Sequence, residues 1–139
     1  MDFNDSKEEA TFRNEAREWL VATAPTAADL NGLDDMGQAK LWQKRKADAG
    51  WACIRWPKEY GGRGANAMEQ VILSQEEAKV KAPNTGFFSI GQGMAAPTMM
   101  TWATEDQKKQ YLPKLASGEN VWCQLFSEPA GGSDLAALR

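Results

Sequence analysis

The spacing of apolar and polar positions predicts that the chain begins with an amphipathic helix. Between about residues 6 and 24, four apolar side chains fall on one helical face: Phe12, Ala16, Trp19 and Leu20. Ser6 and Glu9 have the spacing of a capping box at the start of this segment, and Pro25 ends it. We therefore expect a short helix that needs a partner surface for its apolar face.

A second helix is expected from about residue 36 to residue 49, after a polar connection at residues 25–35. It brings together Leu41, Trp42 and Arg45. Gly50 then provides its C-terminal stop. Residues 51–66 lose the helical period, because Pro57 and several glycines lie among bulky apolar residues. They predict an ordered loop that is packed by aromatic side chains.

Asn66 and Glu69 have capping spacing and open a third helix, which we expect to continue to about Lys81 before Pro83. Its apolar stripe is predicted to consist of Met68, Val71, Ile72, Gln75 and Ala78. Residues 86–102 come next and are apolar on all sides. The apolar positions there are Phe87, Phe88, Ile90, Met94, Ala95, Ala96, Met99 and Met100. Such a helix is typical of the middle of a bundle.

The last part of the chain predicts a change from helices to a strand. Thr104 and Gln107 cap a short helix, which Pro113 is expected to interrupt. Residues 121–127 are bulky, apolar and uncharged, as in a buried strand. The sequence thus predicts a mainly α fold, a helical bundle of five to six helices followed by the first strand of a β domain. We expect the helical domain at residues 1–120 and the start of the β domain at residues 121–139.

The composition is that of an ordinary soluble globular protein, with 42% hydrophobic and 25% charged residues in a chain of 139. A net charge of −3 argues against nucleic acid as a partner. The acidic start of the chain lacks the character of a secretory or transit peptide, and no apolar run is long enough to span a bilayer. We therefore expect a cytoplasmic location and no membrane span.

Histidine is absent from the sequence, which excludes Ser-His-Asp and Cys-His catalysis and the usual zinc hydrolase sites. Cys53 and Cys123 lie far apart and lack the spacing of a zinc ribbon or a redox dithiol, although a single disulfide between them stays open. We expect both to be buried free thiols and expect no metal site.

Two glycine-rich stretches are candidates for ligand binding. Gly91, Gly93 and Ala96 match a dinucleotide fingerprint by letter. No strand precedes them, so we interpret them as small residues where helices approach closely, or as room for an apolar ligand tail. The stretch SEPAGGSD, at residues 127–134, predicts either a strand-exit turn or a loop whose main-chain N–H groups approach an anionic or carbonyl-bearing ligand. Composition leaves both interpretations open.

Three stretches together resemble a known family. WPKEYGGRG, TEDQKKQYLPKLASGE and WCQLFSEPAGGSD occur in an order and spacing similar to the N-terminal helical part of the acyl-CoA dehydrogenase family of flavoproteins. The resemblance covers nearly all of the chain and is weakest before about residue 35. Ser127 to Asp134 satisfies the later part of the family signature, whereas Leu125 and Phe126 replace a commoner small and aliphatic pair. Ala130 and Gly131 also reverse the more usual order.

The resemblance implies FAD as the cofactor and an acyl-CoA thioester as the substrate. The residues that resemble flavin contacts, or that lie near the flavin, are Gln124, Phe126, Ser127, Gly132 and Ser133. Those that resemble substrate contacts are Ser133, Ser89, Ile90 and Gly93. The catalytic glutamate of the family is expected beyond residue 139, and the resemblance does not make Glu128 the base.

The implied reaction is α,β-dehydrogenation, in which a carboxylate removes an α-proton while hydride leaves the β-carbon for the flavin. The resemblance also implies an electron-transfer flavoprotein as the redox partner and a homo- or hetero-oligomer, a tetramer in relatives. We expect these residues to form one wall of the site and to be inactive alone. An alternative is a non-catalytic helical binding or assembly module. In both cases an exposed apolar seam is expected at residues 94–100 and 121–126.

Overall fold

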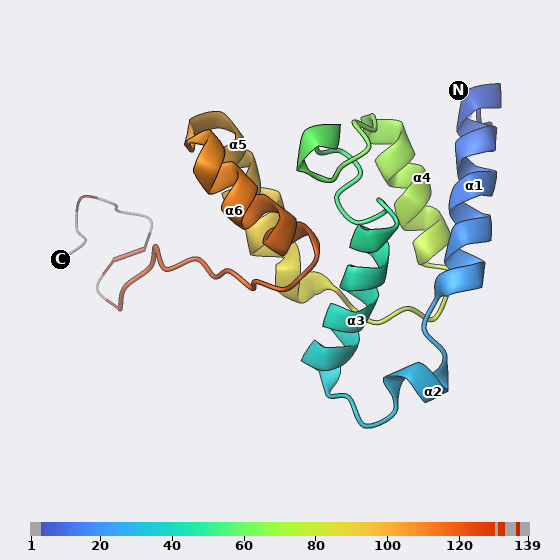
Figure 1. The fold of residues 1–139 in the computed structure, drawn as a ribbon, viewed down its shortest axis with the longest axis horizontal. Coiled ribbons are helices and arrows are strands. Elements are labelled where there is room, and N and C mark those ends of the chain that lie inside the picture. The colour runs from blue at the N-terminus through green and yellow to red at the C-terminus, as the bar shows by residue number, and fades with distance from the viewer. Residues whose placement is uncertain (1–3, 130, 133–135, 137–139) are drawn as a thin grey trace.

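A computed structural model of the chain describes residues 4–129, 131–132 and 136 (Figure 1). Six α-helices lie in this part, which confirms the prediction of a mainly α fold. They are α1 (Lys7–Thr23), α2 (Ala27–Leu30), α3 (Asp35–Asp48), α4 (Ala67–Glu77), α5 (Ala96–Trp102) and α6 (Glu105–Ala116). Shorter turns lie between them: η1 (Lys58–Tyr60) and η2 (Gly86–Phe88) are 3-10 helical, and η3 (Gly91–Ala95) is π-helical.

The helices begin where the sequence predicts that they begin. Each of the three predicted capping pairs forms a complete capping box, in which the side chains and backbone N–H groups of the two residues bond reciprocally. Thr26 and Asp29 form a fourth box at the start of α2. This short helix lies in the stretch that was predicted to be only a polar connection.

The first hydrophobic core lies between α1, α3, α4 and the loop that follows α3. Its buried residues are Ala16, Leu20, Trp42, Trp51, Ile54 and Leu73. Trp19 stacks on Trp42 and on Trp51, with ring centroids 5.5 and 5.6 Å apart. The helical face predicted for the first segment is therefore confirmed as the face that packs inward, and aromatic rings supply much of the buried area.

The second hydrophobic core joins α5 and α6, which Figure 1 shows as a pair beside the α1–α3–α4 group. Its buried residues are Cys53, Trp56, Ala96, Leu112, Leu115 and Ala116. Most of these side chains are small or aliphatic, and a single tryptophan from the loop covers them. This core therefore contains less aromatic area than the first.

Residues 51–65 form the ordered loop that the sequence predicts, and they contribute to both cores. The carbonyl of Ile54 accepts bonds from the N–H groups of Arg63 and Ala65, each at 2.9 Å, so the loop folds back on itself. Gly61 has φ of +88°, where a side chain would be strained. At Gly62 a Cβ atom would lie 2.0 Å from the backbone oxygen of Trp56, so only glycine permits this contact.

The segment at residues 86–102 differs from the single buried helix that was predicted. It is built from η2, η3 and α5 in succession, and its buried residues are Phe88, Gly91 and Ala96. Met94 and Trp102 are exposed, the latter by 81%. The prediction was wrong because α6 and the loop cover one side of this segment and leave other faces open.

Helix α6 continues through Pro113 to Ala116, whereas the sequence predicted an interruption. The proline removes one backbone donor in the last turn of the helix. Leu112, Leu115 and Ala116 are buried in the same turn, and this packing maintains the helix.

The predicted apolar stripe of α4 is also wrong. Of the five residues, Ile72 is buried, whereas Met68, Val71, Gln75 and Ala78 are exposed. The helix ends at Glu77, earlier than predicted, and turns Ile72, Leu73 and Glu76 inward.

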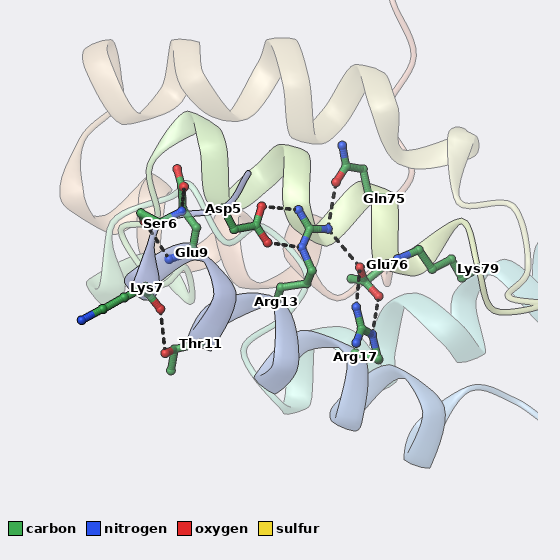
Figure 2. Close-up of polar contacts among 10 residues, drawn as sticks. All are labelled: Asp5, Ser6, Lys7, Glu9, Thr11, Arg13, Arg17, Gln75, Glu76 and Lys79. Atoms are coloured by element: carbon green, nitrogen blue, oxygen red, sulfur yellow. Dashed lines mark hydrogen bonds and ion pairs between the residues drawn. The ribbon is translucent and has the colours of Figure 1, made fainter. Parts of the chain in front are cut away.

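The reason for this orientation is a buried carboxylate. Glu76 is 1% exposed and pairs with Arg13 at 3.0 Å, with Arg17 at 2.9 Å and with Lys79 (Figure 2). Hydrogen bonds from Arg17, then from Lys79 and Arg13, outweigh burial and lower the pKa of Glu76 to about 2. Arg13 also bonds Asp5 in the residues that precede α1, so the ion cluster joins α1 to α4.

Residues 121–127 form no strand in the part of the chain that is described. They follow α6 as an extended segment that passes beside η3 and α5, orange-red in Figure 1. None of their backbone groups bonds to a backbone group of another described residue. A strand requires a neighbouring strand to pair with, so the strand and the β domain stay predictions.

Candidate functional site

A groove of about 370 Å³ lies between the extended segment and the helical segment before it. Its helical wall is made by Ile90, Met94, Ala95, Thr98 and Met99. Its other wall is made by Trp122, Cys123, Gln124, Leu125 and Phe126. We call this the tail groove. Its lining is apolar apart from one amide, one hydroxyl and one thiol, which suits a flat or aliphatic ligand portion.

Close backbone approach positions the two walls of the tail groove. A Cβ atom at Gly91 would lie 2.9 Å from Leu115 Cδ2 and 3.6 Å from Trp122 Cβ, so glycine lets η3 reach both. The ring of Trp122 meets the ring of Tyr111 edge to face at 5.7 Å, which fixes the start of the extended segment. Gln92 donates to the carbonyl of Leu115 at 2.9 Å and ties η3 to the end of α6. The π-helical turn is therefore part of the scaffold of the groove.

A second groove, of about 650 Å³, lies at another face of the same helical segment. We call it the loop groove, because the loop after α3 forms one wall with Ala52, Cys53, Arg55, Trp56 and Pro57. Gln70 of α4 joins the lining. The opposite wall consists of Ser89, Gln92, Gly93, Pro97 and Met100. The two grooves share no lining residue, and the segment at residues 89–100 separates them.

The structure divides the predicted site residues between these grooves. Gln124, Phe126 and Ile90 meet in the tail groove, although the first two are far from Ile90 in sequence. Ser89 and Gly93 line the loop groove instead. The predicted acyl contacts therefore do not form one surface.

The remaining predicted residues lie just after the tail groove. Ser127 Oγ lies 3.6 Å from the position of a Cβ atom at Gly132, so the hydroxyl and this glycine are neighbours. Ser133 lies outside the described residues. The N–H of Gly131 donates to the carbonyl of Glu128 at 3.1 Å, and the N–H of Glu128 donates to the carbonyl of Gly131 at 2.7 Å. This closes the turn that Pro129 favours, and such a turn leaves the ligand-loop interpretation open.

Charge is distributed unequally around the two grooves. Of the described residues that line the tail groove none is charged, whereas Arg55 lines the loop groove. Cys53 lies in the loop groove wall, and burial raises the pKa of its thiol to about 12, so this thiol is not a nucleophile at neutral pH. Cys123 is a free and exposed thiol, which corrects the prediction that both cysteines are buried.

Two classes of function find no support in the described part of the chain. Its His, Cys, Asp and Glu side chains form no group of three or more that could hold a metal ion. No helix in the same residues is long and apolar enough to cross a membrane.

Sequence reasoning missed several residues that line the grooves. Met94, Met99 and Trp122 were expected in an exposed apolar seam but were not named as site residues. Arg55 was not singled out. A signal for Arg55 was available, because it is a charged residue inside an otherwise apolar stretch, ACIRWP.

Comparison with known proteins places this geometry in a family. Residues 6–119 match the profile described as acyl-CoA dehydrogenase, N-terminal domain. Acyl-CoA dehydrogenase IpdE1 of Mycobacterium tuberculosis is 35% identical over 135 residues, which cover 91% of this chain and 35% of that protein. The chain therefore spans about a third of the length of this curated relative.

Solved structures agree with the sequence matches. One chain of the ChsE4-ChsE5 complex from Mycobacterium tuberculosis superimposes with a TM-score of 0.75 at 32% identity, covering 100% of this chain and 35% of its own length. A chain of the structure named Tcur3481-Tcur3483 steroid ACAD superimposes with a TM-score of 0.69 at 31% identity, covering 99% of this chain and 36% of its own length.

Proposed function

Because this chain belongs to the acyl-CoA dehydrogenase family, we propose that it forms the N-terminal part of an FAD-dependent enzyme. The enzyme would remove hydrogen from the α- and β-carbons of an acyl-CoA thioester. In this proposal residues 1–120 are the helical domain, and residues 121–139 begin a β domain. The helical domain contributes one wall of the site for the flavin and the thioester.

One observation carries this proposal. The tail groove brings Ile90, a predicted acyl contact, against Gln124 and Phe126, which are predicted flavin contacts. These predictions came from motifs that are separated by more than a helix in sequence. Their meeting in one apolar groove supports a site in which the acyl chain lies beside the flavin ring.

The exposed segment after residue 121 has the groups that a flavin ring requires. The backbone N–H and carbonyl groups of residues 121–127 have no backbone partner among the described residues, so they are available to the polar edge of the ring. Phe126 is 64% exposed and offers an aromatic face. Ser127 adds a hydroxyl donor. When bound, FAD would supply the acceptor for the hydride that leaves the β-carbon.

The residues of this chain would bind and orient rather than transfer the proton. Ile90, Met94 and Met99 present apolar surface to the acyl chain and exclude water from it. Among the described residues that line the tail groove there is no carboxylate, and we propose that the base that removes the α-proton comes from the rest of the enzyme. The 139 residues alone would then be inactive.

We further propose that the enzyme assembles as an oligomer and passes electrons to an electron-transfer flavoprotein. Two solved neighbours are named as pairs of chains, ChsE4-ChsE5 and Tcur3481-Tcur3483, which supports an assembly of two different subunits. The exposed apolar side chains of Leu125 and Phe126 provide surface that such an assembly, or a β domain, would cover.

Anaerobic mixing with acyl-CoA thioesters tests the proposed function. The native protein, purified from its source cells, is expected to contain flavin and to lose the absorbance of oxidised flavin with at least one thioester. An Ile90→Trp variant, which fills the tail groove, is expected to react at least roughly tenfold more slowly. Val21→Trp is the control, because Val21 is exposed on α1 and lines neither groove.

Two outcomes would contradict the proposal. A native protein that contains no flavin and reacts with no thioester would favour the non-catalytic assembly module. Equal rates for Ile90→Trp and the parent protein would show that the tail groove is not part of the site.

A further inference from the structure

The loop groove contains a cation that has no partner among the residues that the structure describes. Within residues 4–129, 131–132 and 136, the side chain of Arg55 makes no ion pair and no hydrogen bond. Each of the other described arginines pairs with a carboxylate: Arg13, Arg17, Arg45 and Arg63. Arg55 is therefore exceptional in this part of the chain.

The backbone around Arg55 is held firmly although the side chain is free. Ile54 on one side is fully buried, and its carbonyl accepts two backbone bonds. Trp56 on the other side is buried in the second core, and its carbonyl accepts a bond from Gly64 at 2.9 Å. The backbone therefore fixes where this guanidinium enters the groove, and the planar fork of a guanidinium matches the geometry of a carboxylate.

Other polar groups of the loop groove complement this cation. The hydroxyl of Ser89 makes no hydrogen bond to a described residue, so it can donate to a ligand. The amide nitrogen of Gln92 is already used by the carbonyl of Leu115. Arg55 and Ser89 are therefore donors with no partner among the described residues, and Gln70 keeps one amide N–H besides the one it donates to Ser74 at 3.4 Å. Trp56 and Met100 supply apolar surface.

The helical segment that separates the two grooves has open space above one of its residues. A Cβ atom at Gly93 would meet no atom within 4 Å, so the space above this glycine is open. Gly93 lines the loop groove, and its neighbour Met94 lines the tail groove. An extended chain that lies along Ile90 can therefore cross the helical segment over Gly93.

We propose that the substrate is an acyl-CoA whose acyl chain ends in a carboxylate, and that this carboxylate pairs with Arg55. The inference rests on the proposed function, because it takes the tail groove as the place of the reacting part of the chain. Ser89 donates a second hydrogen bond to the same carboxylate. Arg55 is a specificity-determining residue and takes no part in hydrogen transfer.

A binding comparison tests the inference on the native protein, purified from its source cells. Octanoyl-CoA and the CoA monothioester of octanedioic acid are titrated against it without oxygen, with calorimetry and tryptophan fluorescence as readouts. Trp56 lines the loop groove and reports occupancy. The acid-ended thioester is expected to bind at least about tenfold more tightly, because an ionised hydrogen-bonded pair forms only with it.

Two variants and a control show which residues cause the tighter binding of the acid-ended thioester. Arg55→Gln is expected to remove the advantage of the acid-ended thioester and to leave octanoyl-CoA unchanged. Gly93→Leu closes the crossing and is expected to weaken the acid-ended thioester by at least the same factor. Arg63→Gln is the matched control, because Arg63 belongs to the same loop but pairs with Glu15 and stacks on Trp51.

The outcomes separate this inference from the proposed function. Equal binding of the two thioesters, or an advantage that survives Arg55→Gln, would overturn the carboxylate specificity and leave the acyl-CoA site intact. Failure of both thioesters to bind would instead count against the acyl-CoA site of the proposed function.

Discussion

The two hydrophobic cores of this chain differ in their packing and in how much apolar surface stays exposed around them. The first core stacks three tryptophans between α1, α3 and the following loop, and an ion cluster around Glu76 covers one edge of it. The second core buries mainly small and aliphatic residues between α5 and α6. Around it, Trp102 and Leu125 are exposed by 81% and 86%, and the two grooves are open.

This difference separates structural from functional surface. Beside the first core the carboxylate of Glu76 is paired with three cations, as expected where buried polar groups stabilise the fold. Around the second core the apolar side chains of Trp102 and Leu125 are exposed, and Arg55 has no partner among the described residues. This is expected where a ligand or another domain completes the site. The proposed acyl-CoA site in the tail groove and the proposed carboxylate site at Arg55 both lie in the second region.

The largest expected effect tests whether the first region depends on its buried carboxylate. Glu76→Gln removes the charge that three cations share, and we expect the free energy of unfolding to fall by about 3–5 kcal/mol, as for a broken buried pair. Urea denaturation measures it. The control is Glu105→Gln, because Glu105 pairs with Lys108 but is exposed, so little or no change in the free energy of unfolding is expected. Equal effects at both sites would break the contrast between the regions.

Acid titration examines the same carboxylate without mutation. The pKa of Glu76 is lowered from 4.5 in its ordinary state to about 2 in the folded chain. A lowered pKa stabilises the fold above the unfolded value, and this contribution is lost as the pH falls from 4.5 toward 2. One pKa unit corresponds to about 1.4 kcal/mol, so roughly 3 kcal/mol of stability should disappear over this window. Thermal unfolding at a series of pH values measures the loss.

The matched variant sharpens the acid experiment. Glu76→Gln has no carboxyl to protonate at this position, so its stability should depend less on pH over the same window. A parent chain and variant with parallel pH dependence would show that other carboxyl groups cause the acid effect.

The smallest effect compares two glycines of the second region. Gly91→Ala places a Cβ atom 2.9 Å from Leu115 Cδ2, and we expect it to cost about 1–3 kcal/mol through overpacking. Gly93→Ala meets open space and should be neutral or stabilising by up to about 1 kcal/mol, because alanine favours helical backbone. Denaturant melts of both variants measure the difference. A Gly91→Ala chain as stable as Gly93→Ala would show that η3 and α6 can separate freely.

Local signals were sufficient to predict the helices of the first region. Capping pairs such as Ser6 and Glu9 lie within one turn of each other, so they can be read from sequence without knowledge of the fold. Likewise, the face that contains Ala16 and Leu20 follows from helical spacing alone.

The sequence predictions failed where contacts between residues far apart in the chain determine the structure. Glu76 has the character of a surface residue, and its burial depends on arginines that lie about sixty positions earlier in α1. The stripe of α4 was therefore assigned to the wrong face. Pro113 was expected to end a helix, and tertiary packing of its neighbours prevents this. The strand at residues 121–127 stays a prediction, because a strand needs a neighbouring strand to pair with.

Candidate site residues were predicted from the resemblance to a family. Their division between two grooves could not be predicted from it. Ser89 and Ile90 are adjacent in sequence but line different grooves, because successive residues of a helical segment point about 100° apart.

The loop after α3 couples the unfolding of the two hydrophobic cores. Trp51 and Ile54 pack in one core while Cys53 and Trp56 pack in the other, so a stretch of six residues belongs to both. Neither half can lose its packing without pulling side chains out of the other. Slow-exchanging amide protons in α1 and in α6 should therefore share one opening free energy, and the chain should behave as a single cooperative unit.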